Sequence, residues 1–300
     1  INDNLPADTV FVVLCGSGNN GGDGLVITRM LYRQGYSAKA FLLRLGDELT
    51  EDCRKNFERL NGIDSAMVEI LQPGSLIADM PENVVIIDAI LGTGLNRPAE
   101  DWVEDFINHI NELPNKVVSI DIPSGMPADN IPHKGAAKIK ADHTLSFQFY
   151  KRTFLHAETG IYTGDIHVLD IGLSPTFISS THSSYHIQLR EDINQLFKPR
   201  QRFAHKGDFG MAYIIAGSKG MIGAATLSTK AALRSGAGKV RTVVPECGYI
   251  ILQTAVPEAM CSVSGETCIS RIKIDVDKAA IGIGPGMGTA DATVRAVADF

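Results

Sequence analysis

The chain lacks the features that mark secreted, membrane and nucleic-acid-binding proteins. Its five cysteines are an odd number without C-x-x-C spacing, so they indicate neither a disulfide framework nor a zinc site. No apolar run approaches the roughly 20 residues that a membrane helix needs, and no signal peptide is visible. The net charge of -6 disfavours a nucleic-acid partner. We therefore expect a cytoplasmic protein without a nucleic-acid or membrane partner.

The composition is typical of a globular protein with more than one domain. The 300 residues are 44% hydrophobic and 21% charged, and this length exceeds one typical domain. The chain begins at Ile1 and ends at Phe300 within a run that resembles an unfinished helix. We therefore expect a fragment of a longer protein.

A glycine-rich stretch, C-G-S-G-N-N-G-G-D-G, occupies residues 15–24. The apolar run at 9–14 predicts a buried strand before it, and the pattern at 24–34 predicts a helix after it. Its glycines let backbone N–H groups approach a ligand, and a helix N-terminus favours an anion. Two asparagines and Asp23 offer ligands for a cation or a sugar, although such residues also form turns and helix caps. We favour the ligand interpretation.

The same stretch satisfies the dinucleotide pattern G-x-G-x-x-G at Gly16, Gly18 and Gly21. That pattern also requires an acidic residue at the end of the second strand, where it binds a ribose. The second strand is predicted at 38–43, and Asp47 follows too late. An NAD-dependent oxidoreductase is therefore an alternative interpretation rather than the preferred one.

Apolar strands alternate with helices along the first half of the chain. The predicted strands are at 10–14, 38–43, 84–88, 116–121, 143–147 and 165–170, and the predicted helices at 24–34, 50–60 and 100–111. This alternation predicts an α/β fold with a parallel sheet covered on both faces. Polar residues follow three strands: Asn19 to Asp23, Asp88, and Asp121 with Ser124. Because such strands end at one edge of the sheet, we expect a site there.

A second α/β domain is predicted after a stretch rich in Ser, Thr, His and Pro at 174–201. The predicted elements are strands at 212–216, 239–244 and 279–283 and a helix at 224–236. We place the two domains at 1–185 and 186–300. The glycine loop at 284–288 fits a strand-to-helix turn and an anion-binding loop equally well.

Motifs in the same order along the whole chain resemble those of the bifunctional NAD(P)H-hydrate repair enzymes. In the first half these are GSGNNGGDG at 16–24, DAILGTGLNRP at 88–98, VSIDIPSG at 118–125 and a G-x-x-x-G-D-I-H-V-L-D-I-G stretch ending at 172. In the second half they are KGDFG at 206–210, AGSKGMIGAA at 216–225, RSGAG at 234–238, PEAM at 257–260 and IGPGMG at 283–288. The resemblance implies a Rossmann-like three-layer α/β/α domain followed by the first part of a ribokinase-like domain.

The resemblance also implies a reaction. Reduced nicotinamide dinucleotides add water at the C5–C6 double bond, which gives hydrates (NADHX and NADPHX) with R and S epimers at C6. The epimerase domain interconverts these epimers, and the dehydratase domain removes water from the S form with ADP, which magnesium can accompany. The implied partners are this small-molecule substrate and further copies of the chain, as a dimer through the epimerase domain or a higher oligomer.

Carried over residue by residue, the resemblance assigns roles within these motifs. Asp121 would face the nicotinamide ring as the catalytic acid or base. Asn20, Asp88 and Ser124 would bind a potassium ion in the epimerase domain. Lys151 could contact a phosphate, but a lysine of this kind is more often a solvated surface charge. The implied substrate contacts are Asn19, Asn20, Gly21, Gly22, Asp23, Gly92, Thr93, Gly94, Leu95, Asn96, Arg97, Pro98 and Asp121, with Ala224 and Gly286 in the second domain.

The sequence departs from the family pattern at both ends. The helix expected before the first strand is absent or cut short, and the later glycine-rich G-D motif that holds the nucleotide and supplies the dehydratase's catalytic Asp is not among the 300 residues. We therefore expect this chain to epimerise hydrates but not to dehydrate them. A binding protein with an epimerase-like domain and a small-molecule kinase are two further alternatives.

Overall fold

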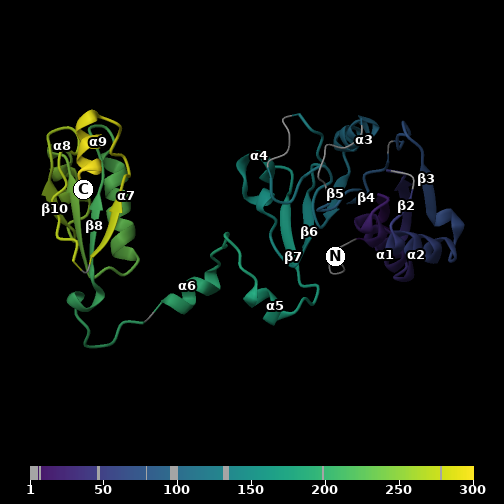
Figure 1. Cartoon of the computed structure of the whole chain (residues 1–300), viewed down its shortest axis with the longest axis horizontal. Coiled ribbons are helices and arrows are strands. Elements are labelled where there is room, and N and C mark those ends of the chain that lie inside the picture. The colour runs from purple at the N-terminus through teal and green to yellow at the C-terminus, as the bar shows by residue number, and fades with distance from the viewer. Residues whose placement is uncertain are drawn as a thin grey trace. The chain divides into compact units, whose positions relative to one another are not determined.

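The chain forms two compact units, Ile1–Ser184 and Tyr185–Phe300. The computed structural model describes residues 6, 8–45, 48–78, 80–94, 101–130, 135–197, 199–277 and 279–300. Figure 1 labels the helices and strands of both units along the chain. The boundary between the units follows Ser184, one residue before the boundary after residue 185 that we expected from the sequence.

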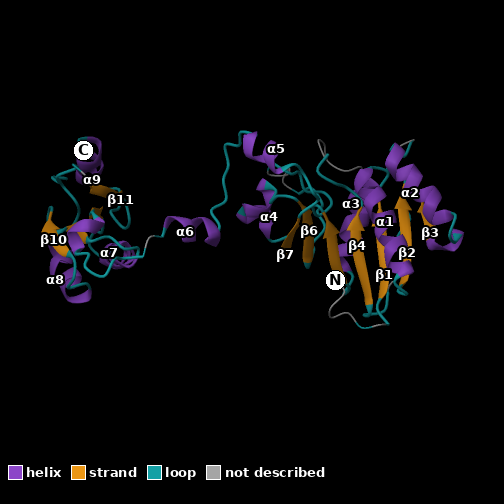
Figure 2. Ribbon diagram, turned by 90° about the horizontal axis from the view of Figure 1, so that it is seen from below, coloured by secondary structure: helices purple, strands orange, loops and turns teal. Residues whose placement is uncertain are grey.

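The first unit is built on a seven-stranded sheet in the order β3-β2-β1-β4-β5-β6-β7, with every neighbouring pair parallel. Its strands are β1 (Val10–Cys15), β2 (Ser37–Leu43), β3 (Val68–Leu71), β4 (Val84–Ala89), β5 (Lys116–Ile120), β6 (His143–Phe147) and β7 (Asp165–Leu169). Its helices are α1 (Asn19–Arg33), α2 (Glu51–Asn61), α3 (Asp101–Glu112), α4 (Ala157–Gly160) and α5 (Pro175–Ser180), with 3-10 turns η1 (Ser65–Met67) and η2 (Arg152–Leu155). Figure 2 shows β1, β2 and β4 with their arrowheads at the same end of the sheet.

The central strand β1 is buried on both faces, because its side chains alternate between two cores. Val12 and Leu14 pack in one core with Phe106 of α3. Val13 packs in the other with Leu25 of α1, and this core also includes residues of α2. Helices therefore cover both faces of the sheet, and the predicted three-layer α/β/α arrangement is confirmed.

Helix α1 begins five residues earlier than the sequence pattern indicates. We expected a glycine loop up to residue 24, but Asn19 is already helical and Gly18 is the N-cap. A Cβ atom at Gly21 would lie 1.8 Å from the Gly16 carbonyl oxygen, and one at Gly22 would lie 3.2 Å from Cys53 Cα. These two glycines therefore allow the helix to approach its own loop and α2 closely, which offsets their low helix propensity.

The second unit has a four-stranded parallel sheet in the order β10-β9-β8-β11. Its strands are β8 (Met211–Ile215), β9 (Lys239–Val244), β10 (Met260–Val263) and β11 (Ala279–Ile283), and its helices are α6 (Arg190–Leu196), α7 (Ile222–Arg234), α8 (Glu246–Ala255) and α9 (Asp291–Ala298), with η3 (Lys206–Phe209). The α/β class expected for this unit is confirmed. No helix among the described residues of the chain is long and apolar enough to cross a membrane.

The close approach at Gly21 predicts that Gly21→Ala destabilises the first unit by about 1–3 kcal/mol, since the added methyl group collides with backbone. Gly18→Ala is the matched control, because a Cβ atom at Gly18 has no neighbour within 4 Å and its φ is -90°. Thermal unfolding of both variants measures the difference. An equal Tm for the two variants would contradict the packing role of Gly21.

Candidate active site

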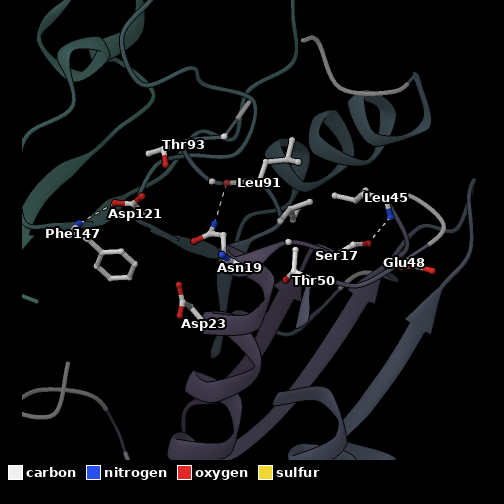
Figure 3. Close-up of a pocket in the computed structure, with 15 residues that line it drawn as sticks. Ser17, Asn19, Asp23, Leu45, Glu48, Thr50, Leu91, Thr93, Asp121 and Phe147 are labelled. Atoms are coloured by element: carbon white, nitrogen blue, oxygen red, sulfur yellow. Dashed lines mark hydrogen bonds between the residues drawn. The ribbon is translucent and has the colours of Figure 1, made fainter. Parts of the chain in front are cut away.

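A cavity of about 860 Å³ lies at the carboxyl ends of the central strands of the first unit (Figure 3). Its lining includes Asn19, Asn20, Asp23, Gly92, Thr93, Gly94 and Asp121, all among the predicted substrate contacts. Gly21 and Gly22 are buried in the packing of α1 and do not line it. Leu95, Asn96, Arg97 and Pro98 lie outside the described residues. The structure thus brings together the polar groups that follow β1, β4 and β5.

Asp121 stands at the end of β5 in a left-handed backbone conformation, with φ of 64°. The Ile122 N–H donates to the Ile120 carbonyl at 2.8 Å, which closes a tight three-residue turn around Asp121. Such turns are rare and strained for residues with a Cβ atom. The surrounding structure holds this conformation, because the Asp121 N–H donates to Leu145 at 2.8 Å.

The Asp121 carboxylate has two partners, one at the end of β6 and one in the segment that follows it. Its Oδ1 atom accepts a hydrogen bond from the Phe147 N–H at 3.0 Å, drawn in Figure 3. Lys151 Nζ lies 2.8 Å from the same oxygen and also donates to the Phe147 carbonyl at 2.9 Å. Only 14% of the Lys151 side chain is exposed. The interpretation of Lys151 as a solvated surface charge is therefore wrong.

Asp23 reaches the same cavity from the first turns of α1 (Figure 3). Although the Asp23 residue is exposed by surface area, partial desolvation of its carboxyl group raises its pKa, and the nearby negative charges of Asp121 and Asp52 raise this pKa further. Asp23 makes no hydrogen bond or ion pair with the described residues. Three carboxyl groups thus line the cavity, those of Asp23, Glu48 and Asp121, and among them Asp121 has an ion pair, with Lys151.

Asp88, at the end of β4, is fully buried and accepts hydrogen bonds on both oxygens. Ser119 Oγ donates to Oδ2 at 2.7 Å, and the Ser124 hydroxyl donates to Oδ1 at 2.5 Å. The N–H groups of Ser124 and Ile90 donate at 2.9 and 3.3 Å. Burial raises the pKa of Asp88, and these hydrogen bonds partly oppose the shift.

Leu91 connects the three residues predicted to bind potassium. The Asn20 amide donates to the Leu91 carbonyl at 3.0 Å (Figure 3), and the Leu91 N–H donates to Ser124 Oγ at 2.8 Å. Ser124 in turn donates to Asp88. Asn20, Asp88 and Ser124 therefore belong to one hydrogen-bonded network beside the cavity, although they come from three separate motifs.

The cavity also has lining residues that the sequence interpretation missed. These are Ser17, Gly18, Leu45, Glu48, Thr50, Ile90, Leu91 and Phe147. Ser17 Oγ donates to Leu43 and accepts from the Leu45 N–H, which ties the loop after β1 to the end of β2. Thr50 caps α2 by accepting from the Cys53 N–H at 3.4 Å. Only the Thr50 cap had a sequence signal, the polar residue preceding an amphipathic helix.

In the second unit, the predicted contacts Ala224 and Gly286 lie against one another. Gly286 has φ of 66°, and a Cβ atom there would lie 2.9 Å from Ala224 Cβ and 2.7 Å from the Met221 carbonyl oxygen. Ser218 Oγ donates to the Gly286 carbonyl at 2.8 Å. The small size of both residues is thus required where the start of α7 packs against the loop that follows β11.

The ion pair between Lys151 and Asp121 predicts a stability cost for Lys151→Met. Loss of the ammonium leaves a largely buried carboxylate with one partner fewer, which we expect to lower the free energy of unfolding by about 1–3 kcal/mol. Lys55→Met is the control, because Lys55 pairs with Glu51 with 53% and 71% of the two side chains exposed, and such pairs contribute little. Equal denaturation midpoints for the two variants would contradict a structural role of the Lys151 pair.

Comparison with known proteins agrees with the motifs of both units. The family model described as "YjeF-related protein N-terminus" matches residues 1–153, about half of the chain, and the model described as "NAD(P)H-hydrate dehydratase" matches residues 212–300. The curated "Bifunctional NAD(P)H-hydrate repair enzyme Nnr" of Escherichia coli is 34% identical over 281 residues, covering 93% of this chain and 52% of that protein.

Two other relatives with the same description match similar shares of the chain. The protein of Moorella thermoacetica is 32% identical, with 98% of this chain and 58% of the relative covered, and that of Thermofilum pendens is 30% identical, with 96% and 56% covered. The chain thus spans little more than half the length of these curated relatives. Since the first family model matches half of the chain, the chain belongs to the YjeF-related family, whose curated members named here are described as bifunctional NAD(P)H-hydrate repair enzymes.

Proposed function

We propose that the first unit interconverts the R and S epimers of NADH and NADPH hydrates. The observation that carries this proposal is the Asp121 carboxylate, which a strained turn holds at the wall of a cavity large enough for a small-molecule ligand. Backbone strain at a polar cavity residue is typical of functional sites. The family model that matches residues 1–153 supports the same assignment.

The chemistry of the substrate explains why a carboxylate is useful at this position. C6 of the hydrate carries a hydroxyl group and is bonded to the ring nitrogen N1. When the C6–O bond breaks, the N1 lone pair forms a double bond to C6 and the ring becomes a cation. Re-addition of water to the other face inverts C6. A fixed negative charge such as Asp121 stabilises the cation more than the neutral hydrate, and this difference lowers the barrier.

The rest of the dinucleotide would bind near the start of α1. No side chain caps this helix, so the first-turn N–H groups remain available at the cavity, and the positive end of the helix dipole favours a phosphate. Asn19 and Thr93 line the same cavity with amide and hydroxyl groups, which suit a ribose or phosphate. The proposed substrate contacts Leu95 to Pro98 directly follow the lining residues Gly92 to Gly94 in the sequence.

A potassium ion fits the network of Asn20, Asp88 and Ser124. Asp88 is fully buried without an ion pair to any described residue, and buried charges are usually paired or bound to a cation. The Asn20 Oδ1 atom accepts no hydrogen bond from the described part of the chain. A cation held by these oxygens would neutralise the Asp88 charge and fix the loop at 90–94 beside the cavity.

For the second unit we propose the dehydration of the S hydrate with ADP, which magnesium can accompany, as an activity of the full-length protein. The family model at 212–300 supports this role. Ala224 and Gly286 would shape the hydrate site with small side chains. We also propose that the chain forms a dimer through the first unit and is located in the cytoplasm. The net charge of -6 is consistent with an enzyme that acts on a small molecule rather than a nucleic-acid binder.

The epimerase proposal predicts that the chain accelerates equilibration of the pure R hydrate of NADH, followed by NMR. Asp121→Asn keeps the shape of the side chain but removes its charge, and we expect the rate of equilibration to fall by about 10²-fold or more. Asp165→Asn, on the exposed strand β7, is the control and should retain the rate. Equal rates for wild type and Asp121→Asn would exclude Asp121 as the catalytic carboxylate.

The potassium site predicts a cation-dependent stability. Replacement of potassium by tetramethylammonium at constant ionic strength should lower the Tm of the wild type, because the large cation cannot enter the Asp88 network. Asp88→Asn removes the charge and should have the same Tm in both salts. An identical Tm of the wild type in the two salts would contradict the potassium site.

A further inference from the structure

We propose that Asp23 is the proton donor of the epimerisation and that Asp121 remains the anion that stabilises the cation. This inference rests on the proposed function and divides its chemistry between two of the three carboxyl groups that line the cavity, the third being that of Glu48. Both residues line the cavity, but Asp23 comes from α1 and Asp121 from the end of β5. Two carboxyl groups in one site take different roles when their environments differ.

The Asp121 carboxylate has two close partners at the cavity wall. Its Oδ1 atom has an ammonium group, Lys151 Nζ, at 2.8 Å and a backbone N–H donor at 3.0 Å. The carboxylate is 12% exposed, so solvent screens this attraction only weakly. Lys151 is held in place by its second bond, to the Phe147 carbonyl. Lys151 is thus a positioning residue that holds the Asp121 carboxylate at the cavity wall.

The environment of Asp23 favours its protonated form. No cationic side chain among the described residues pairs with Asp23. Three acidic groups lie near it or line the same cavity: Asp121 at the end of β5, Asp52 on α2 and Glu48 in the cavity lining. The cation Lys151 is paired with Asp121. Partial desolvation and the charges of Asp121 and Asp52 raise the pKa of Asp23, and this unpaired carboxyl group at the cavity wall is therefore suited to donate a proton.

The proposed reaction begins at the C6 hydroxyl group of the hydrate and returns every proton to the residue that gave it. The Asp23 carboxyl group gives its proton to the C6 hydroxyl group, the C6–O bond breaks with its electron pair on oxygen, and water leaves. The N1 lone pair forms the N1–C6 double bond, and the Asp121 anion stabilises the resulting cation. Water then adds to C6 from either face. The proton that this water releases returns to the Asp23 carboxylate, through a second water molecule when addition is on the far face.

The test compares the wild type with Asp23→Asn, and with Glu58→Gln as a control on the exposed side of α2. Rates of R-to-S conversion are measured against pH at saturating and low hydrate concentration. Loss of a general acid should lower kcat by about 10²-fold or more, with a smaller change in KM. The wild-type rate should fall as the pH rises through the pKa of Asp23, because only the protonated form donates. Asp23→Asn should lack this fall, and Glu58→Gln should retain it.

A second measurement follows the oxygen atom. In water labelled with heavy oxygen, the wild type should incorporate one labelled oxygen at C6 for each epimerisation. Epimerisation without label would show that the C6–O bond stays intact, and would overturn the inference while the epimerase function stands. A wild-type kcat and pH profile in Asp23→Asn would also overturn it. No acceleration by the folded wild type would overturn the proposed function itself. Matching Tm values for wild type and variant ensure that a lost rate reflects chemistry.

Discussion

The buried carboxylate of Asp88 connects the parts of the first unit that form its cavity. Its four hydrogen bonds come from β5, from the segment after β5 and from the segment after β4. Through Ser124 and Leu91 the network continues to Asn20 on α1. Since an unpaired buried charge is costly, this network constrains three strand ends together. The position of Asp121, three residues before Ser124, depends on this arrangement.

The turn at Asp121 has a counterpart one strand further along the sheet. Gln148, which follows β6, has φ of 61° and lies within a similar turn, closed by the Phe149 N–H and the Phe147 carbonyl at 2.7 Å. Its side chain accepts from the Ile171 N–H at 3.0 Å, as that of Asp121 accepts from the Phe147 N–H. Both turns thus anchor a side chain to the next part of the sheet, Asp121 to the last residue of β6 and Gln148 to the segment just after β7. Of the two residues Asp121 lines the cavity and Gln148 does not, so the same backbone geometry occurs at the proposed catalytic carboxylate and at a position outside the cavity.

The sequence predicted the features that depend on local pattern. The apolar runs located the central strands, and the three-layer fold followed from their alternation with helices. The meeting of Asn20, Asp88 and Asp121 at one edge followed from the parallel sheet. The start of α1 was predicted wrongly because glycines normally oppose a helix, and here they allow close packing against Gly16.

Other features depend on long-range contacts that a single sequence does not reveal. The left-handed turn of Asp121 gives no signal, because its isoleucine neighbours are typical of a strand. The Ser119 contact with Asp88 depends on the β4–β5 register, and the Lys151 pair depends on the path of the chain after β6. Strand β3 was not predicted because its sequence, VEIL at 68–71, is only four residues long. Helix α8 was not predicted because its apolar run contains β-branched residues, which are also typical of a strand.

The central claim is that the cavity binds the hydrate with its altered ring at Asp121. A crystal structure of the Asp121→Asn variant with the bound NADH hydrate tests this claim most directly, because the slow variant should preserve a single epimer. We expect the C6 hydroxyl group to lie within hydrogen-bonding distance of Asp23 and beside residue 121, with the phosphates near the start of α1. A ring bound away from these two positions, or phosphates at residue 121, would contradict binding of the hydrate in this orientation.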